Sequence, residues 1–495
     1  MVTTGATKRV DFVFKNARLI DGSGMPSYIG GLAVDNDRIV AIGNVDDYYG
    51  ANTHDLKGIA LAPGFIDAHT HDDRALLSDP RMTSKVSQGV TTVVTGNCGI
   101  SLAPLSYTGR PPAPMDLLCD EGRDYFSSFG AYLDRLDEEP AAVNALCQVG
   151  HTTLRLAAME NLDRPADERE IRAMSGVLEQ ALQDGAIGMS TGLAYPPAKE
   201  APTEEIIALA KVMSSYRGLH STHMRCESDG VMDSLAETLR IGREGEVVNS
   251  IISHHKCSGT SNFGRSRETL AFIDQARAEI KLGLDAYPYV ASSTMLSMDY
   301  ATEAERVVVT WSLPHPEFKG RDLDDVAAEL GLTRAAAVQQ LSPAGAVYFA
   351  MDEADVRRIL AYPHTMIGSD GLPHDSHPHP RLWGTFPRVL GHYARDERIF
   401  SLEEAVRKMT SLTANQFGLV DRGLLRIGAF ADLVVFDPAV VADAATFEHP
   451  TAPATGIQLV LVNGRVVWRD GLHSRERPGR AIRRQQLRDQ LQAAQ

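Results

Sequence analysis

The sequence PGFIDAHTH, residues 63–71, carries two histidines separated by a single residue. The apolar run before them predicts a buried β-strand. Successive side chains of a strand point to opposite faces, so His69 and His71 point in the same direction. Two imidazoles that converge at the end of a strand can share a metal ion. The alternative is two polar residues at a strand–loop junction, and this segment alone leaves both interpretations open.

Eight apolar runs between Ala60 and Leu412 alternate with amphipathic helical patterns. One such pattern, Asp167–Gly185, repeats its apolar residues at the spacing of a helix face and ends at a glycine. This alternation is typical of an α/β fold of the (β/α)8 TIM-barrel class. The eight predicted strands are Gly64–His71, Thr91–Gly99, Asn144–Thr152, Ala186–Ala194, Leu219–Arg225, Ser250–Lys256, Leu282–Tyr289 and Thr365–Asp370.

The connection between the seventh and eighth runs is about 75 residues long, far more than one helix needs. Residues 292–348 of this connection contain a strand-like run, Val307–Trp311, and two short helical patterns. We expect an insertion over the barrel mouth that acts as a lid or shapes the substrate pocket. The alternative is an insertion without substrate contact. The apolar residues of the insertion that could line a substrate pocket are Met295, Leu296, Met298 and Tyr300.

Both ends of the chain are strand-like and rich in turn residues. Asn463-Gly464, between two apolar runs, is a hairpin signal. Neither end has enough strands to close a core alone. We therefore predict one small β-sandwich domain built from residues 1–60 and 416–480. It would accompany a metal-dependent barrel domain of residues 61–415, which contains the insertion.

The composition is that of a globular protein: 495 residues, 43% of them hydrophobic, with a net charge of −15. The negative charge argues against nucleic-acid binding. Five cysteines without CxxC spacing do not resemble a disulfide framework. Residues 1–9 lack the apolar core of a signal peptide, and no run reaches the ~18 apolar residues of a membrane span. We expect a cytoplasmic protein that acts on a small molecule, with no membrane or nucleic-acid partner.

Active sites of such barrels lie at the C-terminal ends of the strands, so metal-type residues there are candidates. Beyond the two histidines they are Cys98, His223, His254 and Asp370. His255 is adjacent to His254, so only one of the two can face inward, and we favour His254. Taken singly, each has an ordinary alternative, such as a packing cysteine or a turn aspartate. A cysteine among imidazoles suits zinc, and the aspartate can exchange protons with water and a leaving nitrogen.

Five further motifs lie on or after the predicted strands. They are GNCG at 96–99, GHTTLR at 150–155, THMR at 222–225, SHHK at 253–256 and DAYPY at 285–289. With the paired histidines, Asp370 and the split β-sandwich, they resemble the N-acyl-D-amino-acid deacylases, or D-aminoacylases, of the amidohydrolase superfamily. The resemblance covers nearly the whole chain. It implies a zinc enzyme that hydrolyses the amide bond of N-acyl-D-amino acids.

The resemblance also implies a metal centre. Cys98, His223 and His254 match the ligands of a tightly held zinc ion. His69 and His71, with Cys98 bridging, match a second, weaker metal position. Many amidohydrolases bridge two metals with a carboxylated lysine on strand four, but residues 188–193, GMSTGL, contain no lysine. This difference argues against the cyclic-imide and dihydroorotase branches.

The same resemblance assigns the remaining site residues. Asp370 matches the general base and acid, and Tyr287 matches the residue that polarises the scissile carbonyl. Lys256, Ser293 and Arg381 match groups that hold the substrate carboxylate. The Met and Leu content near Ser293 favours apolar substrate side chains. The alternatives are an amidohydrolase acting on a cyclic amide or a dipeptide, and a non-catalytic scaffold.

Overall fold

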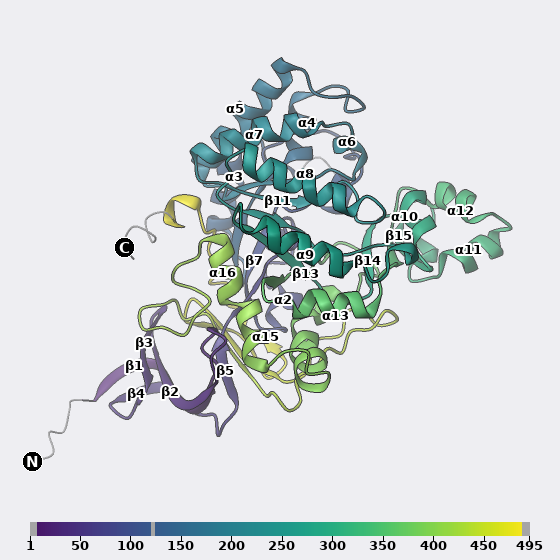
Figure 1. Cartoon of the computed structure of the whole chain (residues 1–495). Helices are drawn as coiled ribbons and strands as arrows, with labels where there is room; N and C mark the ends of the chain where they lie inside the picture. Colours follow the sequence, from purple (N-terminus) through teal and green to yellow (C-terminus); the bar gives the residue numbers. More distant parts are fainter. Residues whose placement is uncertain (1–6, 120–123, 488–495) are drawn as a thin grey trace, which may run out of the picture.

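The computed structural model describes residues 7–119 and 124–487 (Figure 1). Residues 1–6 of the predicted terminal domain and residues 120–123 of the predicted barrel domain lie outside the described part. Within the described ranges, no helix has the length and apolar character needed to cross a bilayer. No disulfide bond joins any of the five cysteines. The cytoplasmic location stays a prediction.

The eight predicted strand segments all contribute to two parallel sheets. The three-stranded sheet has the order β6 (Phe65–Asp67), β7 (Val90–Thr95), β8 (Asn144–Cys147). The six-stranded sheet has the order β9 (Val149–Gly150), β10 (Gly188–Gly192), β11 (Leu219–His223), β12 (Ser250–Ile252), β13 (Leu282–Ala286), β17 (Thr365–Ile367).

The two parallel sheets meet at both of their edges. Only Gln148 separates β8 from β9. On the other side, the Ala68 amide donates to the Ile367 carbonyl at 3.1 Å, and Thr70 forms a parallel bridge with Gly371. These contacts support the predicted (β/α)8 barrel, whose full closure stays a prediction.

The predicted strands extend too far at their C-terminal ends. The first ends at Asp67 instead of His71, and Thr152 of the third lies in helix α4 (His151–Ala158). The cause is local backbone geometry, because extended strands require negative φ. Cys98, His254 and Asp370 have φ of 53°, 36° and 50°. Cys98, His254 and Asp370 therefore lie in sharp turns after β7, β12 and β17, whereas His223 is the last residue of β11.

Helices cover the outside of the parallel strands (Figure 1). The predicted helix at 167–185 is α5 (Glu168–Asp184), with Asp167 and Glu170 forming a capping box. The other helices outside the insertion are α1 (Ala75–Ser78), α2 (Thr83–Val86), α3 (Phe129–Glu138), α6 (Pro196–Lys199), α7 (Thr203–Ser215), α8 (Val231–Glu244), α9 (Ser266–Ala276), α13 (Glu353–Ala361), α14 (Arg381–Arg388), α15 (Leu402–Met409) and α16 (Ser411–Phe417).

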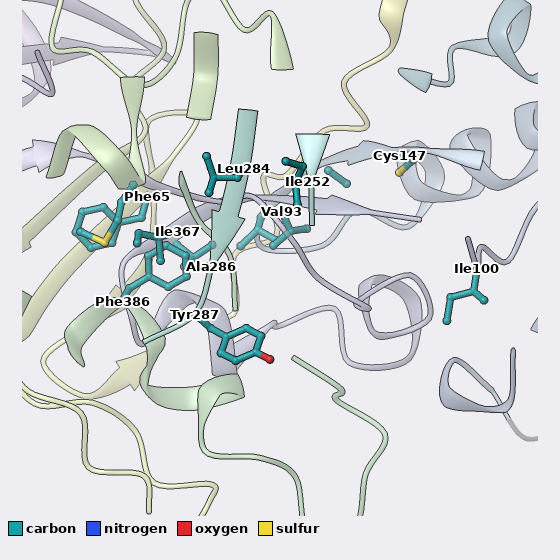
Figure 2. Packing of buried hydrophobic residues seen from close by; sticks show 14 of the residues in the cluster. Phe65, Val93, Ile100, Cys147, Ile252, Leu284, Ala286, Tyr287, Ile367 and Phe386 are labelled. Carbon is teal, nitrogen blue, oxygen red and sulfur yellow. The ribbon is translucent and has the colours of Figure 1, made fainter. Parts of the chain in front are cut away.

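The apolar core between strands and helices ends just below the candidate site. Phe65 stacks on Phe386 with ring centroids 5.9 Å apart, close to Ile367 (Figure 2). Tyr287 follows the last residue of β13, and its hydroxyl group points away from this cluster in Figure 2. A polar group at the edge of the core is thereby presented at the C-terminal end of the strands.

The segment between β13 and β17 contains a three-stranded antiparallel sheet of order β14-β16-β15. Leu296, Phe318, Leu323 and Tyr348 belong to its own hydrophobic cluster. Helices α11 and α12 stand at the far right of Figure 1, away from the parallel strands. The elements are β14 (Ala291–Met295), α10 (Met298–Glu303), β15 (Arg306–Ser312), α11 (Leu323–Leu330), α12 (Arg334–Leu341) and β16 (Ala344–Phe349).

Strands from both ends of the chain pair in one nine-stranded sheet. C-terminal β18 pairs with N-terminal β5, which joins the two halves. This pairing supports the predicted common domain of the termini, while the domain boundaries stay predictions. The strands are β1 (Lys8–Leu19), β2 (Tyr28–Asp35), β3 (Arg38–Gly43), β4 (Tyr48–Asp55), β5 (Ala60–Pro63), β18 (Leu433–Phe436), β19 (Ile457–Val462), β20 (Arg465–Arg469) and β21 (Leu472–His473).

Candidate active site

A buried cluster of metal-type side chains lies at the C-terminal ends of the parallel strands. The Cys98 Sγ atom lies 3.2 Å from Nε2 of His69 and 3.3 Å from Nε2 of His254. One donor atom from each of these residues and one carboxylate oxygen of Asp370 all lie within 4.8 Å of one another. Residues from the loops after β6, β7, β12 and β17 thus meet at one point.

The two other predicted ligands flank this cluster. The His223 ring centroid is 4.5 Å from that of His254, and neither ring nitrogen of His223 has a hydrogen-bond partner among the described residues. His71 Nε2 lies 3.2 Å from an Asp370 oxygen. His255 instead hydrogen-bonds to Thr269 at 2.9 Å, so His254 is the histidine that faces the cluster.

Glycines on both sides of Cys98 let its turn form. A Cβ atom at Gly96 would lie 2.0 Å from the Gln148 carbonyl oxygen, and one at Gly99 would lie 2.7 Å from the Gly192 nitrogen. Both glycines also have positive φ. The two glycines of GNCG are therefore required by close packing against the neighbouring backbone.

The cluster favours charged forms of its members. Burial opposes the Cys98 thiolate, but the charges of His69 and His254 hold the pKa of this thiol well below its usual value. Burial likewise opposes a charged His71, yet the Asp370 carboxylate raises the pKa of His71 to about 9. Burial also disfavours the Asp370 carboxylate, while Arg381 and the nearby imidazoles hold its pKa well below its usual value.

This donor set fits a zinc ion. A thiolate with two or three imidazoles supplies the soft and borderline ligands that zinc prefers over magnesium or calcium. Neither ring nitrogen of buried His223 makes a hydrogen bond among the described residues, and its Nε2 lies 3.6 Å from a Glu227 oxygen. A free ring nitrogen at this position is consistent with a ligand to a metal, because buried polar atoms are rarely left unsatisfied. The residues present therefore fit zinc. His69, Cys98, His254 and Asp370 form one group of converging donor atoms, and His223, Glu227 and His254 form a second group that shares His254.

Three of the predicted catalytic or substrate-binding residues border the cluster. The fully buried Arg381 places Nη1 2.9 Å from Asp370, and its Nη2 donates to the Ser293 carbonyl at 3.0 Å. Its guanidinium lies 4.5 Å from the Tyr287 ring centroid. Among the described residues, the hydroxyls of Tyr287 and Ser293 have no hydrogen-bond partner, and burial raises the pKa of Tyr287 to about 12.

Lys256 has a partner that the sequence did not indicate. Its Nζ atom lies 2.7 Å from both carboxylate oxygens of Glu227 and 2.9 Å from Nδ1 of His254. The ammonium group is therefore close to the cluster, as predicted, but ion-paired within the protein. The predicted role in substrate binding is not tested by this geometry.

Two adjoining spaces lead from the cluster to the surface. An inner one, about 30 Å³, is lined by His71, Asp370 and Tyr287, among others. An outer cleft of about 510 Å³ shares Tyr300 with it. Their combined lining from the insertion is Ser292, Ser293, Thr294, Met295, Ser297, Asp299, Tyr300, Thr302 and Glu303.

The insertion reaches the cleft with its first residues. Of the four apolar candidates, Met295 and Tyr300 line the cleft. The expectation that Leu296 lines the pocket was wrong, because this residue is 4% exposed and belongs to the insertion's own core. Met298 packs against the same core. The difference arises because the chain turns into α10 at Met298, which redirects the side chains.

Several residues of the site were missed by the sequence argument. Glu227 contacts Lys256 and His254, and Nδ1 of His69 lies 3.5 Å from Asp285. Buried Lys85 pairs with Asp67 and donates to Ser369, the residue before Asp370. The available signal was position, since Glu227 follows the predicted strand Leu219–Arg225 by two residues and Asp285 is the second-last residue of β13.

The comparisons identify the class of protein to which this fold and cluster belong. The model of the amidohydrolase family matches residues 52–256 and 263–468, so the chain belongs to the amidohydrolase family. It is 57% identical to D-aminoacylase from Alcaligenes xylosoxydans xylosoxydans over 96% of this chain and 98% of that protein. It is 52% identical to N-acyl-D-aspartate deacylase of the same organism over 96% of both chains.

Solved structures agree with these relatives. A D-aminoacylase structure matches with a TM-score of 0.94 at 54% identity, covering 96% of this chain and 100% of that chain. That D-aminoacylase has a binuclear metal centre, described as one-metal activation and second-metal attenuation. N-acyl-D-glutamate deacylase from Bordetella bronchiseptica matches with a TM-score of 0.93 at 45% identity and the same coverage. That enzyme was solved with zinc and a phosphonate mimic of the tetrahedral intermediate. Within the amidohydrolases, the chain thus groups with the N-acyl-D-amino-acid deacylases.

Proposed function

We propose that this protein is a zinc-dependent deacylase that hydrolyses N-acyl-D-amino acids with apolar side chains to a carboxylate and a free D-amino acid. The observation that carries the proposal is the approach of Cys98, His254 and Asp370 to one another next to buried Arg381, on a chain 57% identical to D-aminoacylase over nearly its full length. The cluster supplies a metal centre, and the adjoining cation suits a carboxylate-bearing substrate.

Cys98, His223 and His254 are the proposed ligands of one tightly held zinc ion, with His69 and His71 at a second, weaker position that shares Cys98. When bound, zinc acts as a Lewis acid that activates water and polarises the amide carbonyl. The binuclear centre of the similar D-aminoacylase structure supports the second position. We also propose that the parallel strands form one closed (β/α)8 barrel of residues 61–415, with a β-sandwich of 1–60 and 416–480.

The chain's own groups carry the proton transfers and hold the substrate. Asp370 takes a proton from the attacking water and delivers it to the leaving nitrogen. The Tyr287 hydroxyl, which has no other partner among the described residues, donates to the oxygen of the scissile carbonyl as it becomes negative. Arg381, Lys256 and Ser293 bind the α-carboxylate of the substrate by charge-assisted hydrogen bonds.

The outer cleft supports a preference for apolar side chains. Met295 and Tyr300 line it, and burying an apolar side chain there gains roughly 1.5–3 kcal/mol. Asp299 and Glu303 also lie on its wall and disfavour a second substrate carboxylate. Arg225 is a cation of this wall, but it is already paired with Glu237 at 2.8 Å.

The test is a chiral panel with zinc quantified. Purified protein is assayed on N-acetyl derivatives of D- and L-Met, Leu, Phe, Ala, Asp and Glu, and on a hydantoin and a dipeptide. We expect turnover of the D-enantiomers, with Met, Leu and Phe above Ala and both acidic derivatives, and at least one zinc ion per chain. Preferred turnover of the hydantoin or dipeptide would favour the alternative amidohydrolase activities. No turnover of any amide with zinc bound would favour a scaffold.

A further inference from the structure

Glu227 lies between the metal cluster and the substrate-binding side of the site. We propose that Glu227 is a positioning residue with two tasks: it orients His254 for the metal, and it holds Lys256 at the edge of the cleft. The inference rests on the proposed function, because it assigns Glu227 a role toward the zinc ligand and the substrate anchor of that same site.

The first task follows from the two nitrogens of His254. Its Nε2 faces Cys98 Sγ at 3.3 Å, while its Nδ1 lies 3.0 Å from a Glu227 oxygen. An imidazole that binds a metal through Nε2 carries its proton on Nδ1 and needs an acceptor there. The Lys256 ammonium, 2.9 Å from Nδ1, has no acceptor capacity, so the Glu227 carboxylate is the group that can fix this tautomer.

The second task follows from the burial of Lys256. The residue is 5% exposed, and both Glu227 oxygens lie 2.7 Å from its Nζ. A buried ammonium without a counter-charge is costly, so Lys256 would move away from this position without the Glu227 carboxylate. The Nζ atom also lies 5.9 Å from the Tyr287 ring centroid. Glu227 thus holds the Lys256 Nζ atom beside the position where the substrate carboxylate is proposed to bind.

The contacts of Glu227 differ from those of a nearby carboxylate, Glu237. Glu237 belongs to the neighbouring helix α8. It pairs at 2.8 Å with Arg225, which is two positions before Glu227 in the chain. No contact of Glu237 with an imidazole occurs among the described residues. Glu237→Gln therefore removes a comparable carboxylate–cation pair without touching the cluster, which makes it a matched control.

The first experiment measures zinc affinity without substrate. Metal-free wild type, Glu227→Gln, Glu227→Asp and Glu237→Gln are titrated with zinc against a chromophoric chelator. We expect affinity to fall about 10–100-fold in Glu227→Gln, the usual cost of losing a carboxylate behind a ligating histidine. Glu227→Asp should recover part of the loss, and Glu237→Gln should match wild type. Unchanged affinity in Glu227→Gln would overturn the first task, and loss of the binding stoichiometry itself would mark Glu227 as a ligand instead.

The second experiment separates KM from kcat at saturating zinc. Glu227→Gln, Lys256→Met and the double variant are assayed on N-acetyl-D-methionine. If Glu227 acts on the substrate through Lys256, KM rises in each single variant and the double variant does not exceed Lys256→Met. Multiplicative KM increases would overturn the second task. A wild type that binds zinc but hydrolyses no N-acyl-D-amino acid would overturn the proposed function while the zinc comparison still stands.

Discussion

Arg381→Met is expected to remove most of the enzyme's discrimination between substrates with and without a free α-carboxylate. The guanidinium is fully buried, with Nη1 beside Asp370 and Nη2 on the Ser293 carbonyl. Its Nε has no hydrogen-bond partner among the described residues, so donor capacity is left for a substrate. Methionine fills similar apolar volume and removes both the charge and the donors.

The magnitude follows from the bond that is lost. A hydrogen bond to a charged group contributes about 1.5–3 kcal/mol. At 1.36 kcal/mol per factor of ten, this corresponds to a change of roughly 10–150-fold in kcat/KM. The same substitution deprives Asp370 of its cation and slows turnover of every substrate. The relevant quantity is therefore the ratio of kcat/KM for N-acetyl-D-methionine to that for its α-carboxamide, in which the common loss cancels.

Steady-state kinetics on both substrates, with zinc content checked, measure this ratio. The expected fall of about 10–150-fold in Arg381→Met corresponds to the free energy of one charged hydrogen bond. Arg388→Met is the matched control, since Arg388 is a partly buried cation of the same helix that pairs with Asp443 and does not line the cleft. An unchanged ratio in Arg381→Met, or an equal change in Arg388→Met, would refute the assignment of Arg381 to the carboxylate.

Three further substitutions test the other parts of the site. Cys98→Ala should lose tightly bound zinc, measured by metal analysis after dialysis, together with activity; full zinc and full turnover would contradict the ligand assignment. Asp370→Ala should retain zinc and lose about 10²–10⁴-fold in kcat, as for other general acid–base groups; a slight loss would mean that another residue moves the proton. Met295→Ala should lower kcat/KM for N-acetyl-D-methionine relative to N-acetyl-D-alanine by up to about tenfold, whereas Met298→Ala, which packs in the insertion core, should leave the ranking unchanged.

Several parallel strands, such as β8 (Asn144–Cys147) and β17 (Thr365–Ile367), were predictable because they belong to short apolar runs that are buried on both faces. Such runs are visible in sequence without knowledge of their partners. The sequence could also indicate that only one of His254 and His255 faces the cluster, because neighbouring side chains of an extended chain point to opposite sides. His254 faces Cys98, whereas His255 contacts Thr269 on α9. Buried strands and the opposite directions of neighbouring side chains could therefore be predicted from the sequence.

The partners of charged residues could not be predicted in this way. Lys256 was assigned to substrate alone, and its 2.7 Å contact with Glu227 depends on how the loops after β11 and β12 approach each other. The same limit applies to the insertion. Its apolar residues were recognised, but whether Met298 faces the cleft or the insertion core depends on the turn into α10 at Ser297. These are long-range or turn-dependent choices that leave no periodic signal.

The strain in the site is an argument for a fixed arrangement of its groups. Left-handed φ at a non-glycine residue costs on the order of 1–3 kcal/mol, and Cys98, His254 and Asp370 each adopt it. Hydrogen bonds hold two of these turns: the His254 amide donates to the side-chain carboxylate of Asp285 at 2.9 Å, and the Asp370 amide donates to the His69 carbonyl at 2.8 Å. Three separate turns of this rare type meet within one buried cluster. An arrangement of this kind is expected where ligands must be held in place before the metal binds, because ordering them afterwards would reduce affinity.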